Sequence, residues 1–361
     1  MQLPQTGLAH TLASGGDRAR HLLGRIITRQ VVKWLSVATS ISMFIVLITG
    51  TLVTTTNSAQ GCGPSWPLCR GQFIPQFAVS TAIEFLHRVS VTPATLLILL
   101  LTVGVLVYWR DRLEIRILAP LMVLFLFAQA ALGALAVMYP QTPAVLALHF
   151  GVSLISFASV LLTTIFLYEQ GAWEKLRDRP VPRGFTALVW GLAVYTYIVV
   201  YLGAFVRHNH VELACQSWPL CANGSNANAV FPGFTGAVGI VFTHRVAALI
   251  LTFGTLWLFV WARRMRVARP DLYWGSLAAL IFLLLQALDG AFVVYSRLDI
   301  FSTLSHSGFV ALLFGAMCYL CMHVLPRPRA ARAADKARTS GNAKGASVIN
   351  STSSHIASSS R

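Results

Sequence analysis

Eight mostly apolar runs, each long enough to cross a membrane, constrain the fold of this chain more than any other feature. A helix needs about 20 apolar residues to span a hydrocarbon core of roughly 30 Å. With 56% hydrophobic and 11% charged residues over a length of 361, the chain is also too apolar for a soluble domain. We therefore predict an all-α integral membrane protein with eight transmembrane helices, at 34–55, 86–109, 117–138, 144–168, 185–206, 236–261, 272–295 and 300–325.

The positive charge of the chain is sorted by side. The formal net charge is +16, and 23 of the 28 Lys and Arg residues fall in the N-terminal arm, the C-terminal tail and every second connection between spans. Under the positive-inside rule these segments are cytoplasmic. The charge predicts a multi-pass protein of the cell (plasma) membrane with both termini cytoplasmic, and it gives no support to nucleic-acid binding.

The chain contains two copies of one residue pattern. A pentapeptide in the first long loop recurs intact in the second, and one offset of 157 residues then relates the following three spans of each half. Each half has four spans, so both halves enter the membrane from the same side. We predict two four-helix bundles related by a pseudo-twofold axis along the membrane normal. The matched segments include 65–69 with 217–221, 87–89 with 244–246, and His149 with His306.

The repeat divides the chain into five segments. We expect a cytoplasmic N-terminal arm, a first four-helix half, a cytoplasmic linker, a second four-helix half and a disordered cytoplasmic tail. Both ends lack apolar periodicity, and the tail is rich in small and polar residues. The segments are 1–33, 34–168, 169–184, 185–325 and 326–361.

Four histidines lie within about two turns of the outer ends of their spans, in the second and fourth span of each half. A lone membrane histidine often only hydrogen-bonds across helices, but the same register in both halves favours a shared ligand. Two imidazoles on facing helices, without a nearby carboxylate or cysteine ligand in the second half, suit a heme better than zinc or copper. His208 and His210 have no first-half counterparts, and we expect them to be solvated loop residues. The candidate ligands are His87, His149, His244 and His306.

Two cysteine pairs lie in the long outer loops, Cys62 with Cys69 and Cys215 with Cys221. Disulfides persist outside the cytoplasm, and closing loops this short is worth roughly 2–3 kcal/mol. We favour structural disulfides, because neither spacing is the C-x-x-C of reactive thiolates. A redox-active pair remains the alternative.

A glutamate breaks the repeat in the first half. Glu84 precedes His87 by three residues, which places both on one helical face, and its second-half counterpart is Val241. A carboxylate beside a heme ligand can manage protons or stabilise a cationic intermediate. The alternative is an interfacial glutamate paired with Arg88.

An aspartate breaks the repeat in the second half. Asp289 stands where the first half has Leu132, and we expect it to be structural and to pair with Arg245. Arg88 and Arg245 each follow a candidate ligand. They could hold heme propionates by charge-assisted hydrogen bonds or serve as interfacial anchors.

In combination, these motifs resemble those of the heme A synthase family. The likeness covers roughly 34–325 and excludes the two ends. Many members carry loop cysteines in only one half, so the second pair here leaves the redox question open. The motifs are GTLV at 50–53, GCGPSWPLC at 61–69, EFLHR at 84–88, GAFVR at 203–207, CQSWPLC at 215–221 and THR at 243–245.

The resemblance implies an oxidoreductase acting on a CH group, which oxidises the C8 methyl of heme O to the formyl of heme A for terminal oxidases. It implies a heme B cofactor on His244 and His306, the substrate heme on His87 and His149, and Glu84 as the carboxylate needed for turnover. The implied partners are membrane lipid, a heme O synthase and an electron acceptor or quinone, with a homo-oligomer as a further option.

Two other functions compete. A di-heme, quinol-linked electron carrier would hold two hemes of one kind and depend little on Glu84. A membrane disulfide oxidoreductase would depend on Cys62 and Cys69 and not on the histidines. The kinds of heme extracted from the purified protein separate the synthase from the carrier.

Overall fold

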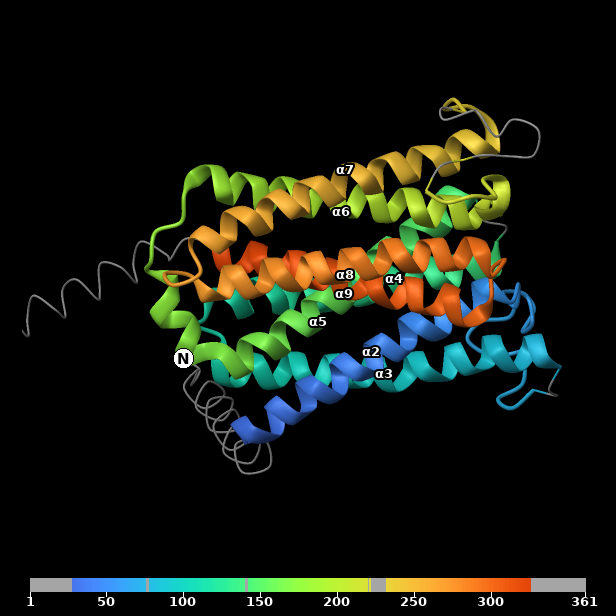
Figure 1. The fold of residues 1–361 in the computed structure, drawn as a ribbon. Helices are drawn as coiled ribbons and strands as arrows, with labels where there is room; N and C mark the ends of the chain where they lie inside the picture. The colour runs from blue at the N-terminus through green and yellow to red at the C-terminus, as the bar shows by residue number, and fades with distance from the viewer. Residues whose placement is uncertain (1–27, 76–77, 140–141, 220, 222–231, 326–361) are drawn as a thin grey trace, which may run out of the picture.

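The computed structural model is an all-helical bundle in which eight helices are long and apolar enough to cross a membrane (Figure 1). It describes residues 28–75, 78–139, 142–219, 221 and 232–325, so most of the predicted arm and the whole tail lie outside the described residues. The elements are α2 (Arg29–Thr55), α3 (Val79–Trp109), α4 (Leu113–Met138), α5 (Pro143–Arg177), α6 (Arg183–His208), the short 3-10 helix η1 (Glu212–Ala214), α7 (Gly236–Arg264), α8 (Pro270–Tyr295) and α9 (Ile300–Val324).

Seven of the helices contain the predicted spans and mostly extend beyond them, and α9 ends one residue before the predicted end at 325. The shortest, α9, has 25 residues and is about 37 Å long, which exceeds a hydrocarbon core of roughly 30 Å. Backbone polar groups have no water partner inside the membrane, so helical hydrogen bonding continues to the interface. As a result α3 begins at Val79 and contains Glu84, and α5 continues to Arg177, through part of the expected linker.

Within each half, the four helices pack as a ring. In the first half α2 contacts α3, α3 contacts α4, α4 contacts α5, and α5 closes against α2. Helices α6 to α9 repeat this order, and the halves meet through α2 and α5 on one side and α6 and α9 on the other. If α2 is exchanged with α6 and α5 with α9, the set of helix contacts between the halves is unchanged. The twofold axis itself stays a prediction.

A buried ion-pair network closes the end of the bundle that carries the basic connections. Arg269 is 2% exposed and donates to the Asp271 carboxylate at 2.6 Å and to the His323 carbonyl at 2.7 Å. The His323 ring lies 2.8 Å from Asp271 and 3.7 Å from Glu169. Buried charges are tolerated where they are paired. Because Glu169 lies on α5 and the other residues lie in or beside α8 and α9, the network joins the two halves.

The two cysteine-bearing loops lie together at the opposite end of the bundle (Figure 1). At this end of the bundle too, hydrogen bonds join the two halves. The Arg207 guanidinium on α6 donates to the Thr54 carbonyl on α2 at 3.2 Å. The hydroxyl of Tyr201, also on α6, donates to the Ala144 carbonyl on α5 at 3.2 Å. Both ends of the interface between the halves are therefore fixed by polar contacts.

Candidate functional site

The four candidate histidines occupy matching places in the two rings. His87 is the ninth residue of α3 and His244 the ninth of α7, while His149 and His306 are each the seventh residue of α5 and α9. Helices α3 and α5 stand at opposite corners of one ring, as do α7 and α9 in the other. Within each half the two imidazoles are close enough to interact electrostatically. The structure thus forms the two pairs that the sequence predicts.

Each of these imidazoles packs against a glycine of the neighbouring helix. A Cβ placed on Gly203 of α6 would lie 2.9 Å from Cε1 of His244, and one on Gly50 of α2 would lie 3.1 Å from Cε1 of His87. Real side chains essentially never approach below 3.0 Å, so the glycine makes room for the ring. The other two histidines are packed in the same way. A Cβ on Gly133 would lie 3.3 Å from Cε1 of His149, and one on Gly290 would lie 3.3 Å from Cε1 of His306.

The surroundings of the rings fit a bound heme in each half. The buried Nδ1 atoms of His149, His244 and His306 have no hydrogen-bond partner among the described residues. Buried polar atoms are nearly always satisfied, so these rings do not serve as ordinary hydrogen-bonding histidines. The described residues contain no cluster of three or more His, Cys, Asp or Glu side chains that could hold a metal ion by themselves. A pair of imidazoles in each half is a ligand set that suits a heme.

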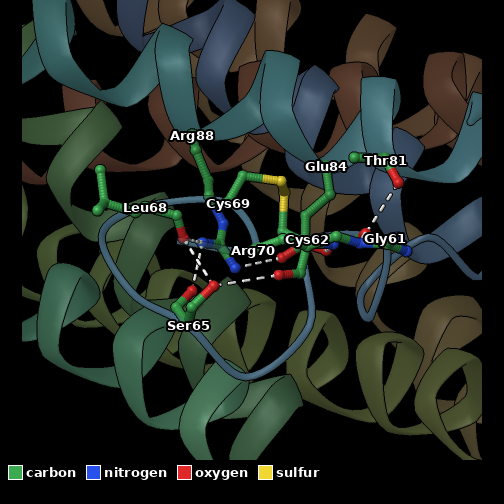
Figure 2. The surroundings of a disulfide bond; sticks show 9 residues. All are labelled: Gly61, Cys62, Ser65, Leu68, Cys69, Arg70, Thr81, Glu84 and Arg88. Carbon is green, nitrogen blue, oxygen red and sulfur yellow. Dashed lines mark hydrogen bonds and ion pairs between the residues drawn. A yellow bond between two sulfur atoms is a disulfide. The ribbon is translucent and has the colours of Figure 1, made fainter. Parts of the chain in front are cut away.

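The first outer loop is closed by the predicted disulfide and is held down by Glu84 and Arg88 (Figure 2). One oxygen of Glu84 accepts the Cys62 amide at 2.7 Å, and the other accepts the Arg88 guanidinium at 2.6 Å. Arg88 also donates to the carbonyls of Ser65 and Leu68, at 2.7 and 2.8 Å. Glu84 is only 3% exposed. The carboxylate therefore connects the helix that carries His87 to the disulfide loop.

The second outer loop is closed and held in a similar way, but with Val241 of α7 in place of the Glu84 carboxylate. Cys215 and Cys221 are joined, with Cα atoms 4.8 Å apart. Arg245 donates to the carbonyls of Ser217 at 2.5 Å and Cys215 at 3.1 Å. The counterpart of Glu84, Val241, lies in an apolar cluster that includes both cysteines. Both arginines thus bind loop carbonyls, and contact with heme propionates stays a prediction.

Two further side chains distinguish the histidine pairs. In the first half the Thr49 hydroxyl lies 3.1 Å from Nδ1 of His87, and the position of Thr49 in the second half is taken by Leu202. In the second half Asp289 lies 3.7 Å from Nδ1 of His306. Among the described residues this carboxylate forms no group of three or more possible metal ligands with the histidines, so the absence of a carboxylate ligand in this half stays a prediction.

The prediction that Asp289 pairs with Arg245 is wrong. The carboxylate instead accepts the Ser305 hydroxyl, at 2.9 Å. The expectation that His208 is a solvated loop residue is wrong too. This residue ends α6, is half-buried, and lies close enough to His149 of the first half to interact electrostatically. Helix packing brings it to the other half, which no local pattern could indicate.

The repeat in the sequence matches Gly50 with Gly203 and Gly133 with Gly290, but it gave no reason for a glycine at these positions. A glycine inside a helix costs about 1 kcal/mol relative to alanine, so four of them at matched positions needed a reason. Their contacts with the histidines supply it. Thr49 could have been found by asking which polar residues near the ligands lack a counterpart, because that comparison had already singled out Glu84.

Known proteins with similar sequences are found over most of the chain. Residues 74–318 match the family described as cytochrome oxidase assembly protein, a range that includes all four histidines and Glu84. The protein named heme A synthase from Bacillus cereus (strain AH187) is 40% identical over 295 residues, which cover 81% of this chain and 93% of the relative. The protein of the same name from Bacillus anthracis (strain CDC 684 / NRRL 3495) is 39% identical over the same shares.

Proposed function

Because the chain belongs to the heme A synthase family of cytochrome oxidase assembly proteins, we propose that it oxidises the C8 methyl group of heme O to the formyl group of heme A. The second half holds a heme B cofactor on His244 and His306. The first half binds heme O between His87 and His149. The observation that carries this assignment is the position of Glu84, a buried carboxylate three residues from one ligand and present in the first half alone.

The residues of the first half position the substrate and its surroundings. Turning a methyl into a formyl group with an oxygen atom from water releases four electrons and four protons, and heme iron supplies the redox chemistry. Glu84 is the carboxylate beside this reaction, where proton transfer by a positioned carboxylate contributes roughly 10²–10⁴-fold. Its bonds to Cys62 and Arg88 fix the disulfide loop next to the substrate ligand.

The setting of the reaction follows from the membrane topology. The basic connections support a topology in which both termini are cytoplasmic and the histidine layer lies near the outer surface of the cell membrane. A heme with a lipid tail reaches such a site from the bilayer. The partners are a heme O synthase that delivers the substrate and an electron acceptor or quinone that takes up the electrons.

The test is chromatography of the hemes extracted from purified wild-type protein and from Glu84→Gln. We expect heme B with heme O or heme A in the wild type. The variant should keep heme B while heme A falls by roughly 10²-fold or more, as expected for loss of a proton-transferring group. Heme B retention controls for folding. Normal heme A in the variant would overturn the role of Glu84, and heme B alone in the wild type would instead support the di-heme carrier.

A further inference from the structure

A small polar cluster lies behind one ligand of the second half. Asp289 on α8 is 8% exposed, and its carboxylate accepts the hydroxyl of Ser305 on α9 at 2.9 Å. One of its oxygens lies 3.7 Å from Nδ1 of His306, the residue that follows Ser305. These are its only polar partners among the described residues. The carboxylate therefore has one hydroxyl donor on one side and an imidazole nitrogen on the other.

The cluster is absent from the first half. At the offset of 157 residues that relates the two halves here, Asp289 corresponds to Leu132 and Ser305 to Leu148. Both polar residues are thus replaced by leucine together, although the histidine and its packing glycine are kept. Such a paired difference indicates that the carboxylate serves the His306 site specifically and is not needed to build the bundle.

The surroundings of Asp289 leave its charge poorly satisfied. A buried carboxylate needs several donors or a positive partner. The Ser305 hydroxyl, its one hydroxyl donor, also lies within 2.8 Å of the Phe301 carbonyl and so has a competing acceptor. The Nδ1 atom of His306, in turn, has no hydrogen-bond partner among the described residues. The carboxylate and this nitrogen lie 3.7 Å apart, slightly farther than a hydrogen bond.

We propose that Asp289 is a positioning residue for the second-half heme, a role that rests on the proposed function of His306 as a ligand. If Nε2 of His306 holds the heme iron, Nδ1 carries a proton, and the Asp289 carboxylate 3.7 Å away would be its acceptor. A carboxylate behind a ligating histidine fixes the ring and increases electron donation to the metal. Asp289 thereby favours the ferric state and lowers the reduction potential of the cofactor heme. Ser305 holds the carboxylate in place.

The experiment is a spectroelectrochemical titration of the purified holoprotein, with Asp289→Asn as the test variant. This variant keeps the shape of the side chain and removes its negative charge. At the wild-type midpoint potential we expect the ratio of ferrous to ferric second-half heme to rise about tenfold, which equals ~59 mV for a one-electron couple. Ser305→Ala should shift the ratio in the same direction by a smaller factor. Glu84→Gln is the matched control and should leave it unchanged.

The outcomes separate this inference from the proposed function. If Asp289→Asn keeps its heme and the ratio is unchanged, the role of Asp289 is overturned. If that variant loses heme, Ser305→Ala decides: a raised ratio supports the role and an unchanged ratio overturns it. The ligand assignment is tested by His306→Ala, whose second-half heme should be lost. Full heme retention in that variant would overturn the proposed site, whatever the titration of Asp289→Asn gives.

Discussion

The two halves of the molecule share a scaffold and differ in where they place a carboxylate. In the first half, Glu84 lies toward the outer loop and binds the Cys62 amide and the Arg88 guanidinium. In the second half, the carboxylate of Asp289 lies 3.7 Å from Nδ1 of His306. The histidines and their packing glycines are repeated, whereas these charges are not. The comparison teaches that the duplicated framework sets two similar sites, and that single polar substitutions give each site its own chemistry.

Among variants that test the shared framework of the two halves, the largest effect is expected from replacing the glycines that contact the histidines. In Gly203→Ala the new Cβ would lie 2.9 Å from the His244 ring, and overpacking of this kind costs ~1–3 kcal/mol. We expect heme B binding to weaken by roughly tenfold or more. Gly50→Ala should instead lower heme A formation and leave heme B in place. Absorbance of the purified proteins and chromatography of extracted hemes measure the two effects.

The control for these variants is Gly191→Ala on the same helix as Gly203. A Cβ at Gly191 meets nothing within 4 Å, so heme content should match the wild type. If Gly50→Ala and Gly203→Ala deplete the same heme, the division of the two hemes between the halves is wrong.

A smaller effect is expected from the arginines that hold the outer loops. Arg88→Lys keeps the positive charge but loses the forked geometry that reaches Glu84 and two loop carbonyls. Hydrogen bonds to charged groups are worth ~1.5–3 kcal/mol each, so the ratio of heme A to heme B should drop by about tenfold.

Arg245→Lys is the matched variant in the second half. It loosens a loop that has no counterpart of Glu84, so it should lower heme B occupancy and leave the heme A yield per bound heme B close to normal. If Arg88→Lys and Arg245→Lys lower the ratio of heme A to heme B equally, the loops contribute to overall stability and not to the binding of a particular heme.

The smallest effect is expected from the hydroxyl beside the first-half ligand. Thr49→Val removes the group 3.1 Å from Nδ1 of His87 while keeping the side-chain shape. A neutral hydrogen bond contributes about 1 kcal/mol, so substrate affinity should fall by about fivefold and heme B content should not change. Titration of the purified protein with heme O measures this affinity.

Thr51→Val is its control, since that hydroxyl bonds the Leu47 carbonyl of its own helix. If both threonine variants weaken heme O binding equally, the contact between Thr49 and His87 has no special role.

Much of the fold could be predicted from the sequence because its signals are local. Apolar length sets each span, and a constant offset places His87 with His244 and His149 with His306 at matched depths. The prediction was weaker at helix ends, where α3 starts well before the apolar run because polar residues such as Ser80 and Glu84 can still be helical at the interface.

The candidate site was predicted less completely, because its partners come from different helices. The sequence placed Glu84 beside His87 but could not show that its oxygens reach the Cys62 amide and Arg88. The sequence predicted that Asp289 pairs with Arg245, whereas the structure places the carboxylate next to Ser305 and His306. Such choices depend on how each helix is rotated about its axis and on which neighbour it meets.

By itself the sequence determined that this protein spans a membrane eight times, that it is duplicated, and that four histidines occupy equivalent positions. These properties follow from hydrophobicity and from the fixed rise of the α-helix, both of which act within one segment. Only the tertiary structure decided that each histidine packs against a glycine of the preceding helix, and that one carboxylate binds a loop while the other lies near the His306 ring. The reason is that packing between helices fixes side-chain partners that lie far apart in the chain.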